Sequence, residues 1–311
     1  MSENDIIISI VSPVYKAEKI IPELVKRIVE HVAPVSGQYE IILVEDGSPD
    51  KSWEQISEAC KANSKVKGVR LSRNFGQHYA ITAGIESAKG KYIVVMDCDL
   101  QDNPKYIPEM IAQCKAGNDI VYTSKVSRRH SGMKNLAAHI YFRLFNYLSE
   151  NQTATGDIGA FSVISRKAAD AFLSIRDYHR HYLMVLRLLG FSSTVITIEH
   201  DNRFEGKSTY TFRKLLAHAI DGITSQSDKL LRISINIGFG FFLISLLWAA
   251  VIIARYFVVG SLPGYTSTMV LMLLSTGLIL MSVGVAGIYI GKIFEQVKGR
   301  PLYFIDQKIN F

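Results

Sequence analysis

The chain has 311 residues, 48% of them hydrophobic, and a formal net charge of +7 at pH 7. This length allows one large soluble domain and a short membrane part. We find no recognition motif for nucleic acid, so the charge fits attraction to anionic headgroups and phosphate-bearing substrates. The three cysteines show no metal-binding spacing, which is typical of reduced residues in a cytosolic domain.

Strand and helix patterns alternate through the first part of the chain. Apolar, β-branched runs predict strands at 6–11, 40–44, 66–71, 92–96 and 119–122. Helical spacing of apolar residues predicts helices at 19–32, 52–63, 78–88 and 104–115. Short buried strands separated by helices indicate an α/β fold with a mainly parallel sheet and helices on both faces. Ligands bind at the carboxyl ends of such strands, so we expect chemistry after Val11, Val44, Leu71 and Met96.

Two later segments have amphipathic helical patterns, at 133–148 and 212–223, with basic and aromatic flanks. Each helix either packs on the sheet or lies in the plane of a membrane surface, and the sequence leaves both readings open.

The last part of the chain contains two long stretches without a charged residue, 233–254 and 256–291. A helix needs about 20 apolar residues to cross a bilayer, so we predict spans near 233–257 and 268–291. Buried core helices are the alternative, disfavoured because such helices rarely run this long without a charge. Basic residues flank the pair, which predicts the inner (cytoplasmic) membrane, with the soluble domain and both termini cytoplasmic. No signal peptide pattern is found at the N-terminus. The flanking basic residues are Lys229, Arg232, Lys292, Lys298 and Arg300.

Three carboxylates follow the fourth predicted strand, at Asp97, Asp99 and Asp102. They repel one another, so a cation should offset their charge. Alternation along an extended chain would put Asp97 and Asp99 on the same side. Such a pair suits Mg²⁺ or Mn²⁺, with positions left for phosphate oxygens. We expect Asp102 instead to cap the helix that starts at Pro104.

Polar or aromatic residues also follow the other strands. Tyr15 offers an aromatic platform for a base, and Arg73 places a cation after the third strand. Asp46 and Ser48 can hydrogen-bond a base or ribose, although a simple Asp-Gly turn would also explain them. The sequence has no glycine-rich dinucleotide motif and no Walker A motif, which excludes those two nucleotide sites.

In this order and at these strand ends, four segments resemble glycosyltransferase family 2, which has the GT-A (Rossmann-like) fold. They are Ser12–Tyr15, Val44–Ser48, Arg73–Gly76 and Met96–Asp102. Further segments, followed by the two spans, resemble polyprenyl-phosphate glycosyltransferases such as bactoprenol glucosyltransferases and dolichyl-phosphate mannose synthases. These are Lys125–Arg128, Tyr141–Asn146, Thr155–Arg166 and Arg203–Tyr210.

The resemblance implies roles for individual residues. It implies a metal site of Asp97 and Asp99 and a catalytic centre of Asp99 and Asp157. The implied nucleotide-sugar site consists of Pro13, Tyr15, Glu18, Asp46, Ser48, Arg73, Asp97 and Gln101. The implied acceptor-phosphate site consists of Lys125, Arg128, Arg203, Lys207 and Ser208. The sequence departs from the family pattern at Lys16-Ala17, at Glu45 and at Ser162, and the last departure removes an arginine usual near Asp157.

The implied reaction is inverting transfer of a hexose, with UDP-glucose as the expected donor, to a polyprenyl (undecaprenyl) phosphate. The implied partners are the donor, the acceptor and the bilayer, without nucleic acid; a homo-oligomer is left open. A processive polysaccharide synthase is one alternative, but Trp53 and Trp248 lie outside its usual Gln-x-x-Arg-Trp motif. An inactive membrane scaffold is another, which the Asp97/Asp99 pair disfavours. The expected domains are a GT-A domain at 1–210, a juxtamembrane helix at 211–232, two spans at 233–292 and a tail at 293–311.

Overall fold

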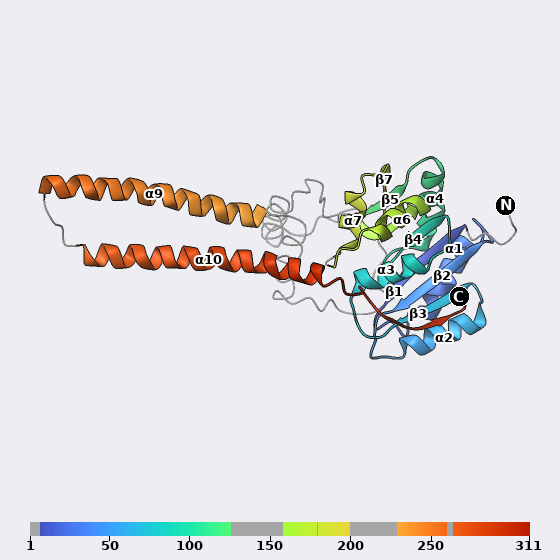
Figure 1. Cartoon of the computed structure of the whole chain (residues 1–311). Helices are drawn as coiled ribbons and strands as arrows, with labels where there is room; N and C mark the ends of the chain where they lie inside the picture. Colours follow the sequence, from blue (N-terminus) through green and yellow to red (C-terminus); the bar gives the residue numbers. More distant parts are fainter. Residues whose placement is uncertain (1–6, 126–157, 179, 200–228, 260–263) are drawn as a thin grey trace. The chain divides into compact units, whose positions relative to one another are not determined.

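The computed structural model describes residues 7–125, 158–178, 180–199, 229–259 and 264–311 (Figure 1). The chain divides into two units, and each is considered by itself. The first, the sheet unit, comprises residues 1–130, 154–209 and 300–311. The second, the helical unit, comprises residues 131–153 and 210–299. The predicted helices at 133–148 and 212–223 lie outside the described residues.

The sheet unit contains one mixed sheet of eight strands in the order β7-β5-β6-β4-β1-β2-β3-β8. Strands β1 to β4 form its parallel centre, and β7 also runs parallel to β5. Strand β6 runs antiparallel to both β4 and β5, and β8 is antiparallel to β3. The strands are β1 (Ile8–Val14), β2 (Tyr39–Glu45), β3 (Val66–Leu71), β4 (Tyr92–Val95), β5 (Ile120–Lys125), β6 (Ile158–Ser165), β7 (Ser193–Ile198) and β8 (Ile305–Ile309).

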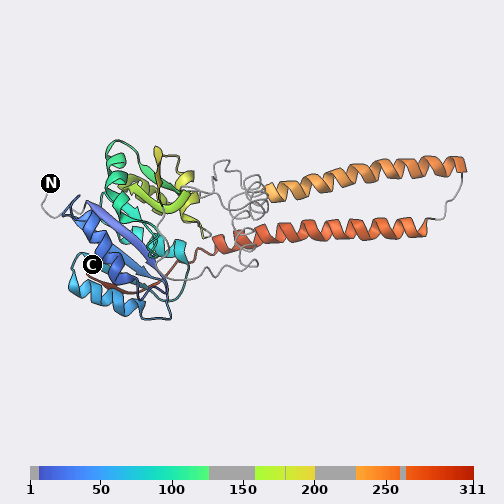
Figure 2. The ribbon, with the colours of Figure 1, turned by 180° about the vertical axis from the view of Figure 1, so that it is seen from behind.

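Helices cover both faces of this sheet (Figures 1 and 2). One face packs against α1 (Ile21–Val32), α2 (Ser52–Ala62) and α4 (Ile107–Lys115), which follows the short helix η1 (Pro104–Tyr106). The other face packs against α3 (Gln77–Ser87), α6 (Arg166–Ser174) and α7 (Tyr182–Leu188). Strands β1 and β2 are buried along their whole length, as expected for a parallel sheet covered on both sides.

The predicted order of the first five strands and four helices is confirmed, with shifts at the ends. The largest shifts are at the ends of β1 and β5, which continue to Val14 and Lys125 instead of ending at Val11 and Tyr122. Pro13 therefore lies inside β1, opposite Val44 of β2. The sequence did not predict β6, β7 or β8.

The C-terminal segment adds the edge strand β8 beside β3. The side-chain amide of Asn310 donates hydrogen bonds to the carbonyl oxygens of Cys60 and Val66, both at 2.8 Å. The backbone amide of Ser72 donates to the carbonyl of Phe304 at 2.9 Å. The end of the chain is thus part of the sheet unit, although the two predicted spans separate it from the rest of that unit in sequence.

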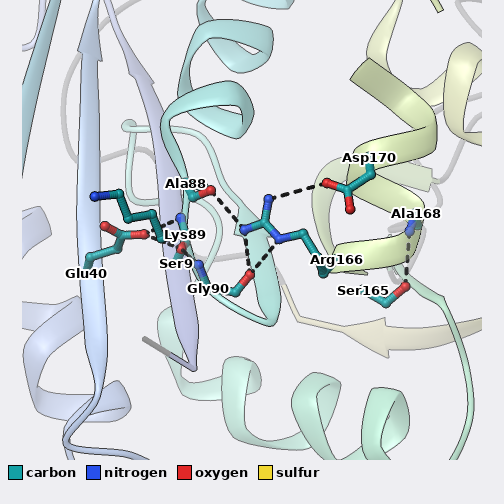
Figure 3. A network of polar contacts seen from close by, with 9 residues as sticks. All are labelled: Ser9, Glu40, Ala88, Lys89, Gly90, Ser165, Arg166, Ala168 and Asp170. Carbon is teal, nitrogen blue, oxygen red and sulfur yellow. Dashed lines mark hydrogen bonds and ion pairs between the residues drawn. The ribbon is translucent and has the colours of Figure 1, made fainter. Parts of the chain in front are cut away.

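A polar network fixes the amino ends of the central strands, at the edge opposite the strand ends where chemistry is expected (Figure 3). The buried Glu40 carboxylate accepts hydrogen bonds from the Ser9 hydroxyl at 2.6 Å and the Lys89 amide at 2.7 Å, and pairs with Lys67 at 2.6 Å. Arg166, at the start of α6, donates to the carbonyls of Ala88 and Gly90. These contacts join β1, β2 and the α3–β4 turn to α6. The buried charge of Glu40 is thus both paired and hydrogen-bonded, as the burial of a charge requires.

The helical unit contains α9 (Lys229–Val259) and α10 (Tyr265–Val297), which lie side by side with a hydrogen bond of 3.1 Å between the Ser234 and Ser282 hydroxyls. Both are long and apolar enough to cross a membrane. Buried residues make up 6% of the apolar window in α9 and 0% of that in α10, so they are not core helices of a soluble fold. The two helices are therefore candidate membrane spans, as the sequence predicted.

Candidate active site

The carboxyl ends of the central strands meet at one edge of the sheet. Val14 of β1 lies opposite Glu45 of β2, and Val11 lies opposite Val95 of β4. Backbone hydrogen bonds extend both pairings by one residue, from Asp46 to Val14 at 3.0 Å and from Met96 to Val11 at 3.1 Å. The residues that follow these strands are therefore neighbours. This edge brings together Tyr15, Asp46 and Asp97, as the sequence predicted.

Asp97 and Asp99 lie in a tight turn and not on an extended chain, so the alternation that we expected for them is wrong. Leu100 has φ 61° and buries its side chain, which is a strained conformation for a residue with a Cβ. The backbone amide of Asp97 donates to the carboxylate of Asp102 at 3.2 Å, which closes the turn. Both Asp97 and Asp99 remain partly exposed.

The buried Asp102 is therefore part of the turn, and its expected role as a helix cap is wrong. The cap of η1 is Asn103, whose side-chain oxygen accepts from the Lys105 amide at 3.0 Å. Either an Asp or an Asn can cap a helix, so composition alone does not separate the two positions.

Gln77, the first residue of α3, contacts the carboxylate pair, and the sequence analysis missed it. Its side-chain amide donates to Asp97 Oδ1 at 2.6 Å. The backbone amide of Gln101 donates to Asp99 Oδ1 at 3.1 Å. Gln77 directly follows the Arg73–Gly76 segment, and this position in the sequence could have indicated it. Each of the two carboxylates is thus oriented by an uncharged donor.

The donor set of this turn fits a hard divalent cation. Asp97 and Asp99 supply carboxylate oxygens, which Mg²⁺ and Mn²⁺ prefer. Between them stands Cys98, but burial, together with the charges of Asp97 and Asp99, raises the pKa of its thiol to about 12. The thiol is therefore protonated at neutral pH and is a poor ligand. Among the described residues no group of three or more His, Cys, Asp or Glu side chains could hold a metal ion. A cation here would take its other ligands from phosphate oxygens and water.

Asp46 anchors the loop that follows β3. Its carboxylate accepts from the backbone amides of Phe75 at 2.7 Å and Gly76 at 2.9 Å, and the Asn74 side chain donates to its carbonyl at 3.0 Å. Burial raises the pKa of this carboxyl, while the two amide hydrogen bonds lower it. Gly47 has φ 61°, and a Cβ there would lie 2.3 Å from the Asn74 nitrogen, so only glycine fits.

Tyr15 is 45% exposed at the end of β1, where its ring can receive a planar group. The next residues are tied to the start of α2. Ser48 Oγ accepts from the Lys16 amide and Ser52 Oγ from the Ala17 amide, both at 3.0 Å. Glu18 accepts from the Lys51 amide at 3.0 Å, which gives this side chain a bracing role. Ser48 and Glu18 thus join the loop that follows Tyr15 to the loop that precedes α2.

Of the remaining predicted site residues, the structure describes Arg73 and Lys125. Arg73 lies with its guanidinium 4.4 Å from the centroid of the Phe75 ring. Lys125 is the last residue of β5. Ser162, which replaces the expected arginine, is buried with its hydroxyl 2.8 Å from that of Tyr182, so it packs inside the sheet unit. Arg128, Asp157, Arg203, Lys207 and Ser208 lie outside the described residues.

The sequence model described as glycosyl transferase family 2 matches residues 9–173, which include the whole carboxylate turn and the Asp46 loop. This chain belongs to glycosyltransferase family 2. The glycosyltransferase is 34% identical over 301 residues to an uncharacterised glycosyltransferase of Synechocystis sp., with 96% of this chain and 94% of the relative covered. It is 31% identical to the undecaprenyl-phosphate 4-deoxy-4-formamido-L-arabinose transferase of Pseudomonas fluorescens strain Pf-5, covering 97% of this chain and 90% of the relative.

The described sheet and its helices have the GT-A fold that the resemblance implied for this family 2 glycosyltransferase. Mannosyl-3-phosphoglycerate synthase from Rubrobacter xylanophilus superposes with a TM-score of 0.49 at 15% identity, over 71% of this chain and 72% of that one. TarS of S. aureus, solved in complex with UDP-GlcNAc, gives a TM-score of 0.46 at 18% identity, over 71% of this chain and 66% of that one.

Proposed function

We propose that this glycosyltransferase moves a hexose from a nucleotide-sugar to a polyprenyl phosphate at the cytoplasmic face of a membrane. The observation that carries the proposal is the partly exposed Asp97–Asp99 turn beside the Asp46 loop, in a chain that continues into two apolar helices. The relative from Pseudomonas fluorescens, named for transfer to undecaprenyl phosphate, matches over 97% of this chain, so the likeness includes the helical unit.

In this proposal the donor lies along the edge formed by β1, β2 and β4. The ring of Tyr15 supports the base. Asp97 and Asp99 would hold Mg²⁺ or Mn²⁺, and such a cation, when bound, offsets the charge of the nucleoside diphosphate that leaves. Gln77 keeps the Asp97 carboxylate oriented through its 2.6 Å hydrogen bond. The further donor contacts are proposed for Pro13, Glu18, Asp46, Ser48, Arg73 and Gln101.

The transfer step requires little acid–base chemistry from the protein. An oxygen of the acceptor phosphate bonds to the anomeric carbon while the bond from that carbon to the nucleoside diphosphate breaks, and its electron pair leaves with the diphosphate. A phosphate monoester has a second pKa of about 6, so it is mostly ionised at cytosolic pH. Asp157 then positions the acceptor or a cation, without accepting a proton. The acceptor phosphate contacts are proposed for Lys125, Arg128, Arg203, Lys207 and Ser208.

Membranes that contain the chain, incubated with undecaprenyl phosphate and a panel of nucleotide-sugars, test this function. Mass spectrometry of the lipid extract should find one sugar per lipid. We expect UDP-glucose to be the donor; the names of relatives such as the Pseudomonas fluorescens transferase make a 4-deoxy-4-formamido-L-arabinose donor the second candidate. A polymeric product would instead indicate a processive synthase. The absence of product with every donor, together with no binding of metal or nucleotide, would indicate an inactive scaffold.

A further inference from the structure

A pocket of about 550 Å³ lies within the sheet unit, and neither Asp97 nor Asp99 lines it. Its walls come from three separate parts of the chain: the loop after β3 with the first turn of α3, the residue Tyr178 before α7, and the C-terminal segment that leads into β8. The volume is in the range of small-molecule sites. We call it the tail pocket, and its principal residues are Arg73, Phe75, Tyr79, Tyr178, Arg300 and Phe304.

Two arginines give the tail pocket its charge. Arg73 and Arg300 line it from segments far apart in sequence. Within the part of the chain that the structure describes, none of the ion pairs involves either guanidinium. Arginine binds phosphate oxygens through a planar fork of N–H donors. The charge of this pocket therefore fits an anion with several oxygens.

The other walls are aromatic and partly apolar. Phe304 is 57% exposed, and its ring centroid lies 6.4 Å from that of Phe75. The rings of Tyr79 and Tyr178 lie 6.5 Å apart, and the Tyr79 hydroxyl donates to the Tyr178 carbonyl at 2.6 Å. An exposed aromatic rim beside two guanidinium groups suits a ligand that has both an anionic head and an apolar part.

The covalent connection to α10 places one side of the tail pocket near the bilayer surface. The apolar window of α10 ends at Val297, and Arg300 follows it by three residues. Residues 298–300 follow the end of α10, and three residues span at most roughly 10 Å even when fully extended. Arg300 therefore lies at the depth of the lipid headgroups if α10 crosses the membrane, and Lys298 lies at a similar depth.

We propose that the tail pocket binds the phosphate of an anionic membrane phospholipid, with Arg73 and Arg300 as the groups that contact it. This site lies apart from the Asp97–Asp99 turn and goes beyond the proposed function, although it shares Arg73 with the proposed donor site. Its ligand shares the phosphate group with free phosphate and with the polyprenyl phosphate acceptor. The bilayer is the favoured source, because the pocket joins its charge to an exposed aromatic rim and Arg300 directly follows a membrane helix.

The full-length chain in detergent, titrated with phosphatidylglycerol or phosphatidylcholine and observed by native mass spectrometry, tests this site. We expect the first phosphatidylglycerol to bind with at least tenfold preference. Arg300→Gln should weaken that binding about tenfold, because a charge-assisted contact is lost. Lys298→Gln is the matched control: it removes the same charge two residues away, where Lys298 Nζ lies 4.0 Å from the Phe294 ring centroid and does not line the pocket. We expect less than a twofold effect. Arg73 stays intact, since a donor contact is also proposed for it.

Several outcomes would overturn the site. An equal loss in both variants would mean general attraction to anionic headgroups. Equal binding of phosphatidylglycerol and phosphatidylcholine, which share the phosphate and differ in net charge, would mean that the pocket does not select an anionic lipid. Displacement of the bound lipid by inorganic phosphate at the same concentration would assign the pocket to a free anion. Displacement by equimolar undecaprenyl phosphate would make it part of the acceptor site. Both variants should unfold at the wild-type temperature, because Arg300 and Lys298 are exposed. The experiment measures lipid binding, so a negative result would not contradict the proposed sugar transfer.

Discussion

The side-chain amide of Gln77 donates a 2.6 Å hydrogen bond to Asp97 Oδ1, and so joins the start of α3 to the carboxylate turn after β4. The same helix start follows the loop that Asp46 holds through the Phe75 and Gly76 amides. The ends of β2, β3 and β4 are therefore mechanically connected. A change at one of these positions should therefore alter both the carboxylate turn and the Asp46 loop of the proposed donor site.

Replacing Asp99 with Asn should abolish transfer and leave the fold intact. Loss of one charged group that stabilises the leaving diphosphate costs about 10²-fold or more in rate. The measurement is kcat/KM for sugar transfer with saturating Mg²⁺ or Mn²⁺. The matched control is Asp170→Asn on α6, whose side chain is 64% exposed and which should keep full activity. Near-normal turnover of Asp99→Asn would reject the metal assignment.

Replacing Gln77 with Glu should lower kcat/KM by about tenfold or more. The new carboxylate would face Asp97 at hydrogen-bond distance, and two like charges this close disfavour each other. Gln77→Ala should be milder, since it removes the donor without adding charge. The dependence of rate on Mg²⁺ or Mn²⁺ concentration separates the cases: Gln77→Glu should change it more than Gln77→Ala. Identical curves would show that Gln77 does not orient Asp97.

Replacing Gly47 with Ala should destabilise the sheet unit by about 3 kcal/mol and raise the KM for the donor. Part of the cost, about 1–2 kcal/mol, is the left-handed backbone, and the rest is overpacking against the Asn74 backbone, which adds about 1–3 kcal/mol. Gly190→Ala is the control, because Gly190 has nearly the same φ, 65°, but nothing lies within 4 Å of an added Cβ. Chemical denaturation of both variants gives the comparison. Equal losses would mean that the contact with Asn74 is unimportant.

The thiols of Cys60 and Cys114 should resist alkylation in the folded protein. Burial raises their pKa to about 11 and about 12. At pH 8 the reactive thiolate is then about one part in 10³ or less. Both are also buried, so reagent reaches them only after unfolding. Iodoacetamide labelling at pH 8, read by peptide mass with and without urea, should show modification only in urea. Rapid labelling of either thiol without urea would contradict their burial.

The central sheet could be predicted from sequence, because its strands are short apolar runs separated by helical patterns. Those strand boundaries, with the rule that ligands bind at the carboxyl ends of parallel strands, also located Tyr15, Asp46 and Asp97. The conformation of the Asp97–Asp102 turn could not be predicted, since it depends on the left-handed Leu100 and on the Asp102 carboxylate. Gln77 was missed because its partner lies 20 residues away and belongs to another element.

Strand β8 was missed for a different physical reason. Its sequence shows no clear alternation of apolar and polar residues, and four of its five residues are exposed. Its pairing with β3 arises from backbone hydrogen bonds. An edge strand of this kind leaves almost no hydrophobic pattern. Side-chain contacts such as those of Asn310 with Cys60 and Val66 then fix its position.

The strand that completes one edge of the sheet is synthesised after all the other strands of that sheet. Because β8 follows α10, β3 has no partner on that side until both long apolar helices have been synthesised. An unpaired strand edge invites association with other chains. A polypeptide that terminates before Ile305 would therefore carry an open edge, which links maturation of the sheet unit to completion of the two long apolar helices during biosynthesis.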